Sequence, residues 1–299
     1  MTRTFAASAA LVVLCATGRA ELIYGLTGAQ QGSRLIRFDS AAPETALTLA
    51  DLTGALPGHI VRGIDFRPAT GELYAVSSNG TAGQLYTMNL STAALTPVGT
   101  GFEFGADPGI RVSMDFNPVA DRVRLVTGER QNLRVNPDTG ALVTEDADLS
   151  WSSGDPAAGA ETPYIGAIAY SNNTADAIMT TLYAIDFQQD LFATQGGPGG
   201  SPVSPNSGLL FSIGTLGLIT ADAGIGFDIS GQTGIGYVSY NQAFIGEQFG
   251  TVDFATGRII RIGAFDRLDV LDIAVAVPAP GAGVLAGIAL LAGFRRRAR

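Results

Sequence analysis

Lysine is absent from this 299-residue chain, and histidine, cysteine and tryptophan each occur once. Without Lys, neither a Walker-type phosphate loop nor a Ser-x-x-Lys nucleophile is available. Cys15 lies in the N-terminal leader, so the rest of the chain has no disulfide and no thiolate metal site. His59 follows a Leu-Pro-Gly turn with no motif around it. It is interpreted as a surface or capping residue rather than as the base of a Ser-His-Asp arrangement.

Positive charge is also scarce. All 18 basic residues are Arg, and six of them lie in the end segments 1–20 and 277–299, which contain no acidic residue. Residues 21–276 therefore carry 27 acids against 12 Arg, a net charge of −15. Binding to phosphate backbones needs a basic face, so this balance argues against nucleic acid as a partner.

Helical periodicity is missing between residues 21 and 276. The chain instead has segments of four to seven residues that alternate or are rich in β-formers, bounded by Gly, Pro, Asn or Asp. With 46% hydrophobic residues, these segments can still build a substantial core. The pattern predicts an all-β fold.

One phrase recurs along this region, and it centres on an aspartate. Gly63-Ile-Asp-Phe-Arg-Pro is followed by a strand ending Leu-Tyr-Ala-Val, and close copies contain Asp115 and Asp228. A weaker copy at 167–185 has Ala169 where the others have Asp. A second phrase, an alternating strand and an Asn- or Asp-initiated turn such as 136–140, follows each first phrase. Two such phrases per unit of 40–50 residues predict a β-propeller.

The repeats give five blades. Blades two to five are expected at 60–100, 110–145, 164–217 and 222–263. Residues 22–51 supply three strands of blade one, and 270–275 supply its missing first strand, with Asp272 at the position of Asp65. The C-terminal strand thus closes the ring and leaves no free sheet edge. A six-bladed ring, with an irregular blade in 141–217, is the alternative.

Residues 1–20 have the layout of a secretory signal peptide. Arg3 precedes an apolar run, and Gly18 and Ala20 are small residues at the −3 and −1 positions, which places cleavage between Ala20 and Glu21. An uncleaved anchor helix is the alternative, although the run is shorter than the ~20 residues that a span needs. Signal peptidase is the partner that cleavage implies.

The C-terminus, residues 277–299, has three parts. It begins with Val277, Pro278, Ala279 and Pro280, continues with 14 uncharged residues at 281–294, and ends in Arg295, Arg296 and Arg297 with Arg299 behind them. An apolar segment followed by an Arg cluster is typical of a membrane contact whose charged end stays in the cytoplasm. We expect transient or permanent inner-membrane contact through 281–294, and a plain membrane anchor is one interpretation.

These three parts closely resemble the PEP-CTERM sorting signal of Gram-negative bacteria, in which an exosortase cuts near the Pro motif. The usual motif is Val-Pro-Glu-Pro, and Ala279 replaces the Glu. The resemblance implies an exosortase-type partner and delivery to the cell surface or the extracellular space. Without cleavage, the domain would stay tethered to the inner membrane and face the periplasm.

The repeats themselves resemble an uncharacterised domain-of-unknown-function family of bacterial secreted proteins with propeller-like repeats. The resemblance depends on 23–27, 63–76, 132–140 and 226–230. It implies a propeller fold and secretion, and it brings no activity.

Candidate chemistry is sparse, and we predict no catalytic, cofactor-binding or metal residue. The first strands of a propeller line its axis, so Asp65, Asp115, Asp228 and Asp272 would converge there and could hold Ca²⁺ through oxygen. The preferred interpretation is structural: a repeated Asp in Asp-Phe-x-Pro is suited to accepting hydrogen bonds from backbone N–H groups of the next turn. The dense acidic segment 145–148, with Trp151, is interpreted as a solvated loop, although aromatic and carboxylate groups together can bind sugars.

The sequence therefore predicts an exported, surface-sorted propeller with a binding or structural role in the cell envelope or extracellular matrix. Extracellular polysaccharide or another surface protein is the expected partner, because loops on a rigid ring are natural binding surfaces. The alternative is a secreted propeller hydrolase that uses paired carboxylates and Ca²⁺.

Overall fold

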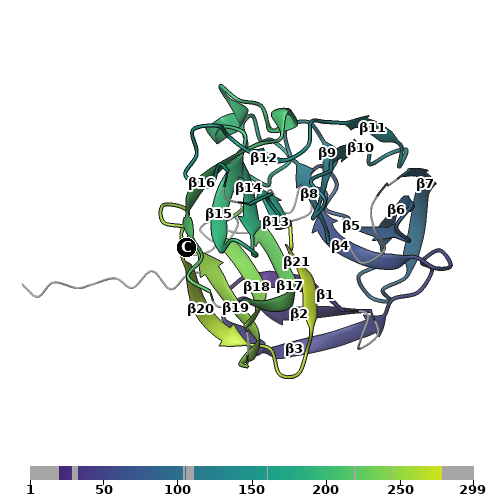
Figure 1. Ribbon diagram of the computed structural model, residues 1–299. Helices are drawn as coiled ribbons and strands as arrows, with labels where there is room; N and C mark the ends of the chain where they lie inside the picture. Colours follow the sequence, from purple (N-terminus) through teal and green to yellow (C-terminus); the bar gives the residue numbers. More distant parts are fainter. Residues whose placement is uncertain are drawn as a thin grey trace, which may run out of the picture.

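The computed structural model describes residues 20–28, 33–103, 105, 111–159, 161–218, 220–242 and 244–277, with only the backbone of 220–223. Its strands form five antiparallel sheets arranged around a common axis (Figure 1). The five-bladed propeller is confirmed, and the six-bladed alternative is wrong. Two short 3₁₀ turns, η2 (Pro198–Gly200) and η3 (Pro205–Ser207), are the helical elements of the described residues.

Each blade runs from an inner strand at the axis to an outer strand at the rim. Blade one contains β21 (Val270–Val275), β1 (Leu22–Thr27), β2 (Arg34–Asp39) and β3 (Ala42–Asp51). Blade two contains β4 (Ile60–Phe66), β5 (Leu73–Ser78), β6 (Ala82–Met88) and β7 (Leu95–Glu103). Blade three contains β8 (Val112–Asn117), β9 (Arg122–Thr127), β10 (Asn132–Val135) and β11 (Leu142–Glu145).

Blade four contains β13 (Ile165–Tyr170), β14 (Leu182–Asp186), β15 (Leu191–Gln195) and β16 (Leu209–Thr215). A fifth strand, β12 (Ser150–Trp151), pairs in parallel with the outer edge of β16. Blade five contains β17 (Thr220–Ile229), β18 (Gly236–Gln242), β19 (Gly246–Val252) and β20 (Ile259–Ala264).

The core lies between the blades. Five clusters of buried apolar side chains fill the five interfaces, each built from two neighbouring blades. A middle strand is therefore covered on both faces, and every residue of β5 is buried. The outer strands β3 and β20 have mixed or exposed patterns because one side of each faces solvent. This explains why inner and middle strands have nearly continuous apolar sequences.

The turns that link the strands follow the predicted chemistry. The side chain of Asn136 accepts hydrogen bonds from the backbone N–H groups of Asp138 and Thr139, at 2.9 and 3.3 Å. Asp253 accepts one from Ala255 at 2.8 Å. Such Asx turns satisfy the backbone locally, and the interpretation of 136–140 and 253–257 as turns is confirmed.

The ring closes within blade one, as predicted. β21 lies antiparallel to β1, with Ile23 opposite Val275. On the axis the inner strands contact one another in the closed order β21, β4, β8, β13, β17 and back to β21. The first and last described strands of the chain are therefore neighbours in one sheet.

Glu21, the residue before β1, ties blade one to blade five. Its carboxylate accepts hydrogen bonds from the hydroxyls of Ser230, Thr233 and Tyr237, the last two at 2.8 Å. Its backbone N–H donates to Ser40 Oγ at 2.9 Å. Burial raises the pKa of Tyr237 to about 12, and the Glu21 carboxylate raises it as well. The Glu21 side chain is buried, so the three hydroxyls take the place of water around its carboxylate.

We expect Glu21→Ala to lower the free energy of unfolding by about 2–4 kcal/mol, because three hydroxyls lose a buried charged acceptor. Chemical denaturation followed by circular dichroism measures this. Glu44→Ala, an exposed acid on β3, is the matched control and should change the value by less than about 0.5 kcal/mol. Equal stability of the two variants would contradict the role assigned to Glu21.

Candidate functional site

The repeated aspartates lie on the inner strands, and three of them bond the neighbouring blade in the same way. Asp65 Oδ2 on β4 accepts from Phe116 N at 2.7 Å, and Asp115 Oδ1 on β8 accepts from Tyr170 N at 3.0 Å. Asp228 Oδ2 on β17 accepts from Val275 N at 2.6 Å. Each carboxylate thus bridges its own blade to the backbone of the next.

Asp272 bonds the next blade at a different level. Asp65 and Asp228 lie opposite tyrosines on the middle strand of their blades, whereas the residue opposite Tyr24 in blade one is Ala274. The prediction that Asp272 occupies the Asp65 position is therefore wrong by two residues. Asp272 and Ala274 are two residues apart and so lie on the same face of the strand. The sequence alone therefore does not decide which of them occupies the Asp65 position.

The structural equivalent of Asp272 is Ser113. Asp272 Oδ2 accepts from Ile64 N at 2.9 Å, and Ser113 Oγ accepts from Ile168 N at 3.0 Å. Glycines flank Asp272 on both sides of the ring. A Cβ added to Gly226 would lie 2.7 Å from the Asp272 Cα atom, and one on Gly63 would lie 3.0 Å from Oδ2. Asp272 therefore fits only because its neighbours have no side chain at this level.

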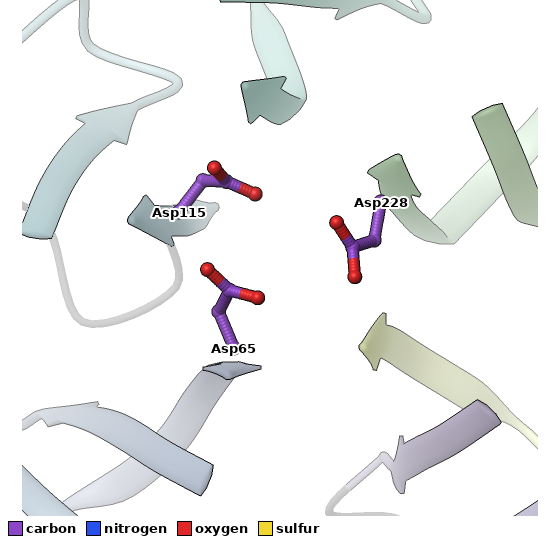
Figure 2. Close-up of side chains that lie close together, drawn as sticks. All are labelled: Asp65, Asp115 and Asp228. Carbon is purple, nitrogen blue, oxygen red and sulfur yellow. The ribbon is translucent and has the colours of Figure 1, made fainter. Parts of the chain in front are cut away.

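Three carboxylates face one another across the axis. Oxygen atoms of Asp65, Asp115 and Asp228 lie within 4.8 Å of one another, and the three side chains point toward one centre (Figure 2). All three are buried. Blades four and one have Ala169 and Ala274 at the corresponding position, so these two blades add no carboxylate to the cluster.

Burial and mutual repulsion disfavour the charged forms of these groups. Burial first, and then the Asp228 carboxylate, raise the pKa of Asp65 well above its usual range. Burial followed by the charges of Asp65 and Asp228 does the same to the pKa of Asp115. Burial raises the pKa of Asp228 to about 7, against the backbone N–H groups that favour its charged form. Such a cluster is stable if it shares protons or if a cation neutralises it.

One oxygen in the cluster has spare capacity. Asp65 and Asp228 each accept two backbone hydrogen bonds. Asp115 accepts one, on Oδ1, and its Oδ2 has no hydrogen-bond partner among the described residues. The prediction that the aspartates accept hydrogen bonds from backbone N–H groups is confirmed, but the donors lie in the adjacent residue and on the neighbouring blade, not in the next turn. The oxygen geometry leaves a cation compatible with the same residues.

His59 forms part of a small buried network. Its Nδ1 lies 2.9 Å from Ser77 Oγ, which donates to the hydroxyl of Tyr86 at 3.1 Å. Burial lowers the pKa of His59. No carboxylate contacts the ring within the described part of the chain, and Ser77 is fully buried. His59 is the residue before β4, and no Ser-His-Asp arrangement forms around it among the described residues.

The acidic segment 145–148 is mostly the exposed loop that was predicted, with Glu145 and Asp148 exposed, but the prediction is wrong for Asp146 and for Trp151. Trp151 lies in β12 and packs into the core between blades three and four. Asp146 has a side chain 6% exposed, and it pairs with Arg124 at 3.2 Å and with Arg134 at 2.8 Å. Sequence reasoning missed these pairs because the two Arg come from strands whose pairing the sequence does not reveal.

A second buried carboxylate was also not identified from the sequence. Glu247, at the start of β19, has a pKa raised to about 9 by burial and by the nearby Asp269, while Arg111 lowers it. The repeated phrases, which centre on Asp65, Asp115 and Asp228, give no signal for it.

Of the predicted processing residues, the structure describes three. Ala20 is exposed, Glu21 is buried and Val277 lies two residues after the end of β21. Pro278, Ala279, Pro280, Arg295, Arg296 and Arg297 lie outside the described residues, and cleavage at either end stays a prediction. Over the part of the chain that is described, no helix has the length and apolar character to cross a membrane.

Comparisons with known proteins agree with the fold. A family model described as a domain of unknown function (DUF4394) matches residues 34–274. No curated protein matches the sequence. A chain of an engineered GH43 glycoside hydrolase, with endo-xylanase and exo-arabinofuranosidase activity, has a TM-score of 0.51 at 10% identity, covering 87% of this chain and 52% of that one. At this identity the likeness extends to the fold alone.

Two further solved structures are similar at lower scores. A chain of a nidogen/laminin complex has a TM-score of 0.46 at 12% identity, covering 86% of this chain and 98% of that one. TolB from Acinetobacter baumannii has a TM-score of 0.45 at 13% identity, covering 86% and 67%.

The raised pKa values of the axial carboxylates predict that the stability of the fold depends on pH. Between the ordinary Asp pKa near 4 and the value of about 7 for Asp228, the folded chain binds more protons than the unfolded chain. The free energy of unfolding therefore falls as pH rises through this window, by up to roughly 4 kcal/mol for this group. We expect the melting temperature to fall from pH 5 to pH 8 in metal-free buffer.

Asp228→Ala should lower stability overall but flatten this slope, because the titrating group is gone. Asp266→Ala, at an exposed acid before β21, should keep the wild-type slope. An unchanged slope in Asp228→Ala would show that the axial cluster does not titrate as described.

Proposed function

The chain belongs to the family of domains of unknown function DUF4394, and we propose that this member is an exported, surface-sorted propeller with a binding role in the cell envelope or extracellular matrix. The observation that carries the proposal is the use of the axial aspartates. They hydrogen-bond the backbone of the next blade and so make a closed, rigid ring. A rigid ring presents its loops as the variable, ligand-facing part.

The bounds of blade one support processing at both ends of the domain. Its ladder begins at Leu22, whose carbonyl accepts from Ala276 N at 2.9 Å, and its last strand ends at Val275. Cleavage by signal peptidase after Ala20 and by an exosortase-type enzyme near 277–280 would thus leave every described strand in place. We propose delivery to the cell surface or the extracellular space, with the inner-membrane-tethered form as the alternative.

We expect the protein recovered from its native host to begin near Glu21, to end near Pro280 and to lie outside the inner-membrane fraction. Intact mass spectrometry and terminal sequencing of each cell fraction measure this. A chain that still carries 281–299 in the inner membrane would contradict surface sorting, and its binding role would then be periplasmic.

A second function has one observation in its favour. The carboxylate oxygens of Asp65, Asp115 and Asp228 lie close enough to share a hard cation, and Asp115 Oδ2 is unused by the backbone. Ca²⁺ prefers carboxylate oxygens, and a cation here would neutralise the buried charges. A propeller hydrolase that uses carboxylates and Ca²⁺ is the activity that this site would support.

If Ca²⁺ binds there, its addition at pH 7.5 should raise the melting temperature and a chelator should reverse the effect. Asp115→Ala should abolish the response and any hydrolase activity, while losing just one backbone hydrogen bond. Elemental analysis of the purified domain is the independent readout. A metal-free protein with no Ca²⁺ response and flat hydrolase assays would exclude this function and leave the binding role unaffected.

A further inference from the structure

A cavity of about 170 Å³ lies between blades three and four, at the end of the ring where their inner strands finish. Asn117 and Tyr170, the last residues of β8 and β13, line it. Blade three contributes three arginines, and blade four contributes the loop 204–206. Three of the 12 Arg residues between 21 and 276 thus line one small cavity in a strongly acidic domain.

Blade three departs from the repeat at this place. The residue opposite the axial position is a tyrosine in the other four blades, Tyr24, Tyr74, Tyr183 and Tyr237. In blade three it is Arg124, opposite Asp115. The strand register also sets Arg134 directly opposite Arg124. Like charges in this relation destabilise a sheet unless another group offsets them.

One carboxylate offsets this pair. Arg124 donates to Asp146 at 3.2 Å, and its other donors reach the Tyr170 hydroxyl and the side chains of Asn132 and Asn206. Arg134 donates twice to Asp146, at 2.8 Å each. Two guanidinium groups therefore share a single negative charge, in a place where the Arg124 side chain is 2% exposed.

The third arginine has no acidic partner within the described structure. Arg122 donates from Nη1 to the carbonyl oxygen of Asp121 at 2.7 Å. The Asp121 carboxylate is held by Arg67 of blade two, at 2.5 and 2.9 Å. Because Asp121 is engaged elsewhere, the cavity keeps three guanidinium groups against one carboxylate. Its lining therefore has an excess of about two positive charges.

The cavity adjoins a second hollow with apolar walls. This hollow, of about 170 Å³, shares Asn117, Ala120, Tyr170 and Pro205 with the first. Val119, Ile178 and Met179 line its far side, and their side chains are 47%, 94% and 58% exposed. A polar, positively charged compartment thus adjoins an exposed apolar strip.

We propose that this cavity binds the carboxylate of a uronate residue in an acidic polysaccharide, with the adjoining sugar lying along the Val119, Ile178 and Met179 strip. The proposal rests on the binding role above and names its site and ligand class. Guanidinium groups bind a planar carboxylate through paired hydrogen bonds. Amide and hydroxyl groups of Asn117, Ser204 and Asn206 suit sugar hydroxyls, and the apolar strip suits the C–H faces of a sugar ring.

Size favours a sugar over a larger ligand. Pockets for drug-sized molecules usually measure about 300–1,000 Å³, so this cavity accepts one small ring or a single acidic group. The neighbouring hollow of about 170 Å³ gives room for a second unit, which suits a polymer whose units repeat. A peptide C-terminus would bring a carboxylate as well, and it serves as a competing outcome below.

The test uses the processed domain and a defined probe, an oligogalacturonate, with isothermal titration calorimetry as the readout. We expect saturable binding that weakens with salt, since it depends on charge. The methyl-esterified oligomer, of the same shape without charge, should bind about tenfold more weakly or worse. Arg122→Gln should weaken binding of the charged oligomer by a similar factor.

The control variant is Arg37→Gln, which removes the same charge from the exposed face of β2 in blade one. It should bind the oligogalacturonate like the wild type. The Arg122 side chain makes one hydrogen bond among the described residues and is half-buried, so Arg122→Gln should keep the wild-type melting temperature.

Three outcomes would overturn the site. Arg122→Gln and Arg37→Gln could bind the oligogalacturonate with equal affinity, the wild type could bind the charged and esterified oligomers equally, or no binding could be detected. If a peptide with a free C-terminal carboxylate competes and the oligogalacturonate does not bind, the uronate assignment is wrong. Binding of a neutral polysaccharide or a surface protein independent of Arg122 would overturn this site but leave the proposed function standing. A protein that is neither exported nor able to bind any matrix polymer would overturn both.

Discussion

The ring depends on one interaction, a side chain of an inner strand that accepts a hydrogen bond from the backbone N–H of the next blade. Neighbouring blades share no sheet ladder, so their inner strands need another link across the axis. Asp65, Asp115 and Asp228 provide it at one level, and Asp272 and Ser113 at another. The cost is electrostatic: the carboxylates that fasten the blades also repel one another. Each buried N–H would cost about 1–3 kcal/mol if left unpaired, which explains why the repulsion is tolerated.

The boundary between blades four and five shows what replaces this link. Ala169 stands at the aspartate position there, and aromatic side chains fill the interface. The Phe192 ring packs edge-on against the Phe227 ring with 5.9 Å between their centroids, and the ring centroids of Tyr183 and Phe254 lie 4.7 Å apart. Aromatic pairs contribute about 0.5–1.5 kcal/mol each beyond the area that they bury. Two such pairs match one carboxylate–amide hydrogen bond, so packing can hold this boundary without a carboxylate. Aromatic pairs also cross boundaries that have a carboxylate link, where they act beside it.

Much of the fold was predictable because the blades of a propeller repeat one sequence pattern. Alternation, Asx turns and the recurrent Asp-Phe phrase identified the blades, and the unpaired strand at 270–275 identified the closure. The level of Asp272 was not predictable, since Ala274 and Asp272 share a face and residue type alone favoured the wrong one. Asp146 and Trp151 were misplaced because their partners, Arg124 and Leu210, come from other strands and are set by strand register. The arginine cavity has the same origin: Arg124 and Asn206 are 82 residues apart and meet only after blades three and four pack.

Closure within blade one also shapes how the chain reaches this structure. β1 and β21 pair across almost the whole described sequence, from Ile23 to Val275. Loop-closure entropy makes such a contact the slowest kind to form, and topologies rich in long-range pairs fold slowly. A chain synthesised from its N-terminus keeps the inner edge of β1 open until β21 has been added. The last described strand is then the one that completes the first blade, and the cooperative unit exists only once residue 275 has been synthesised.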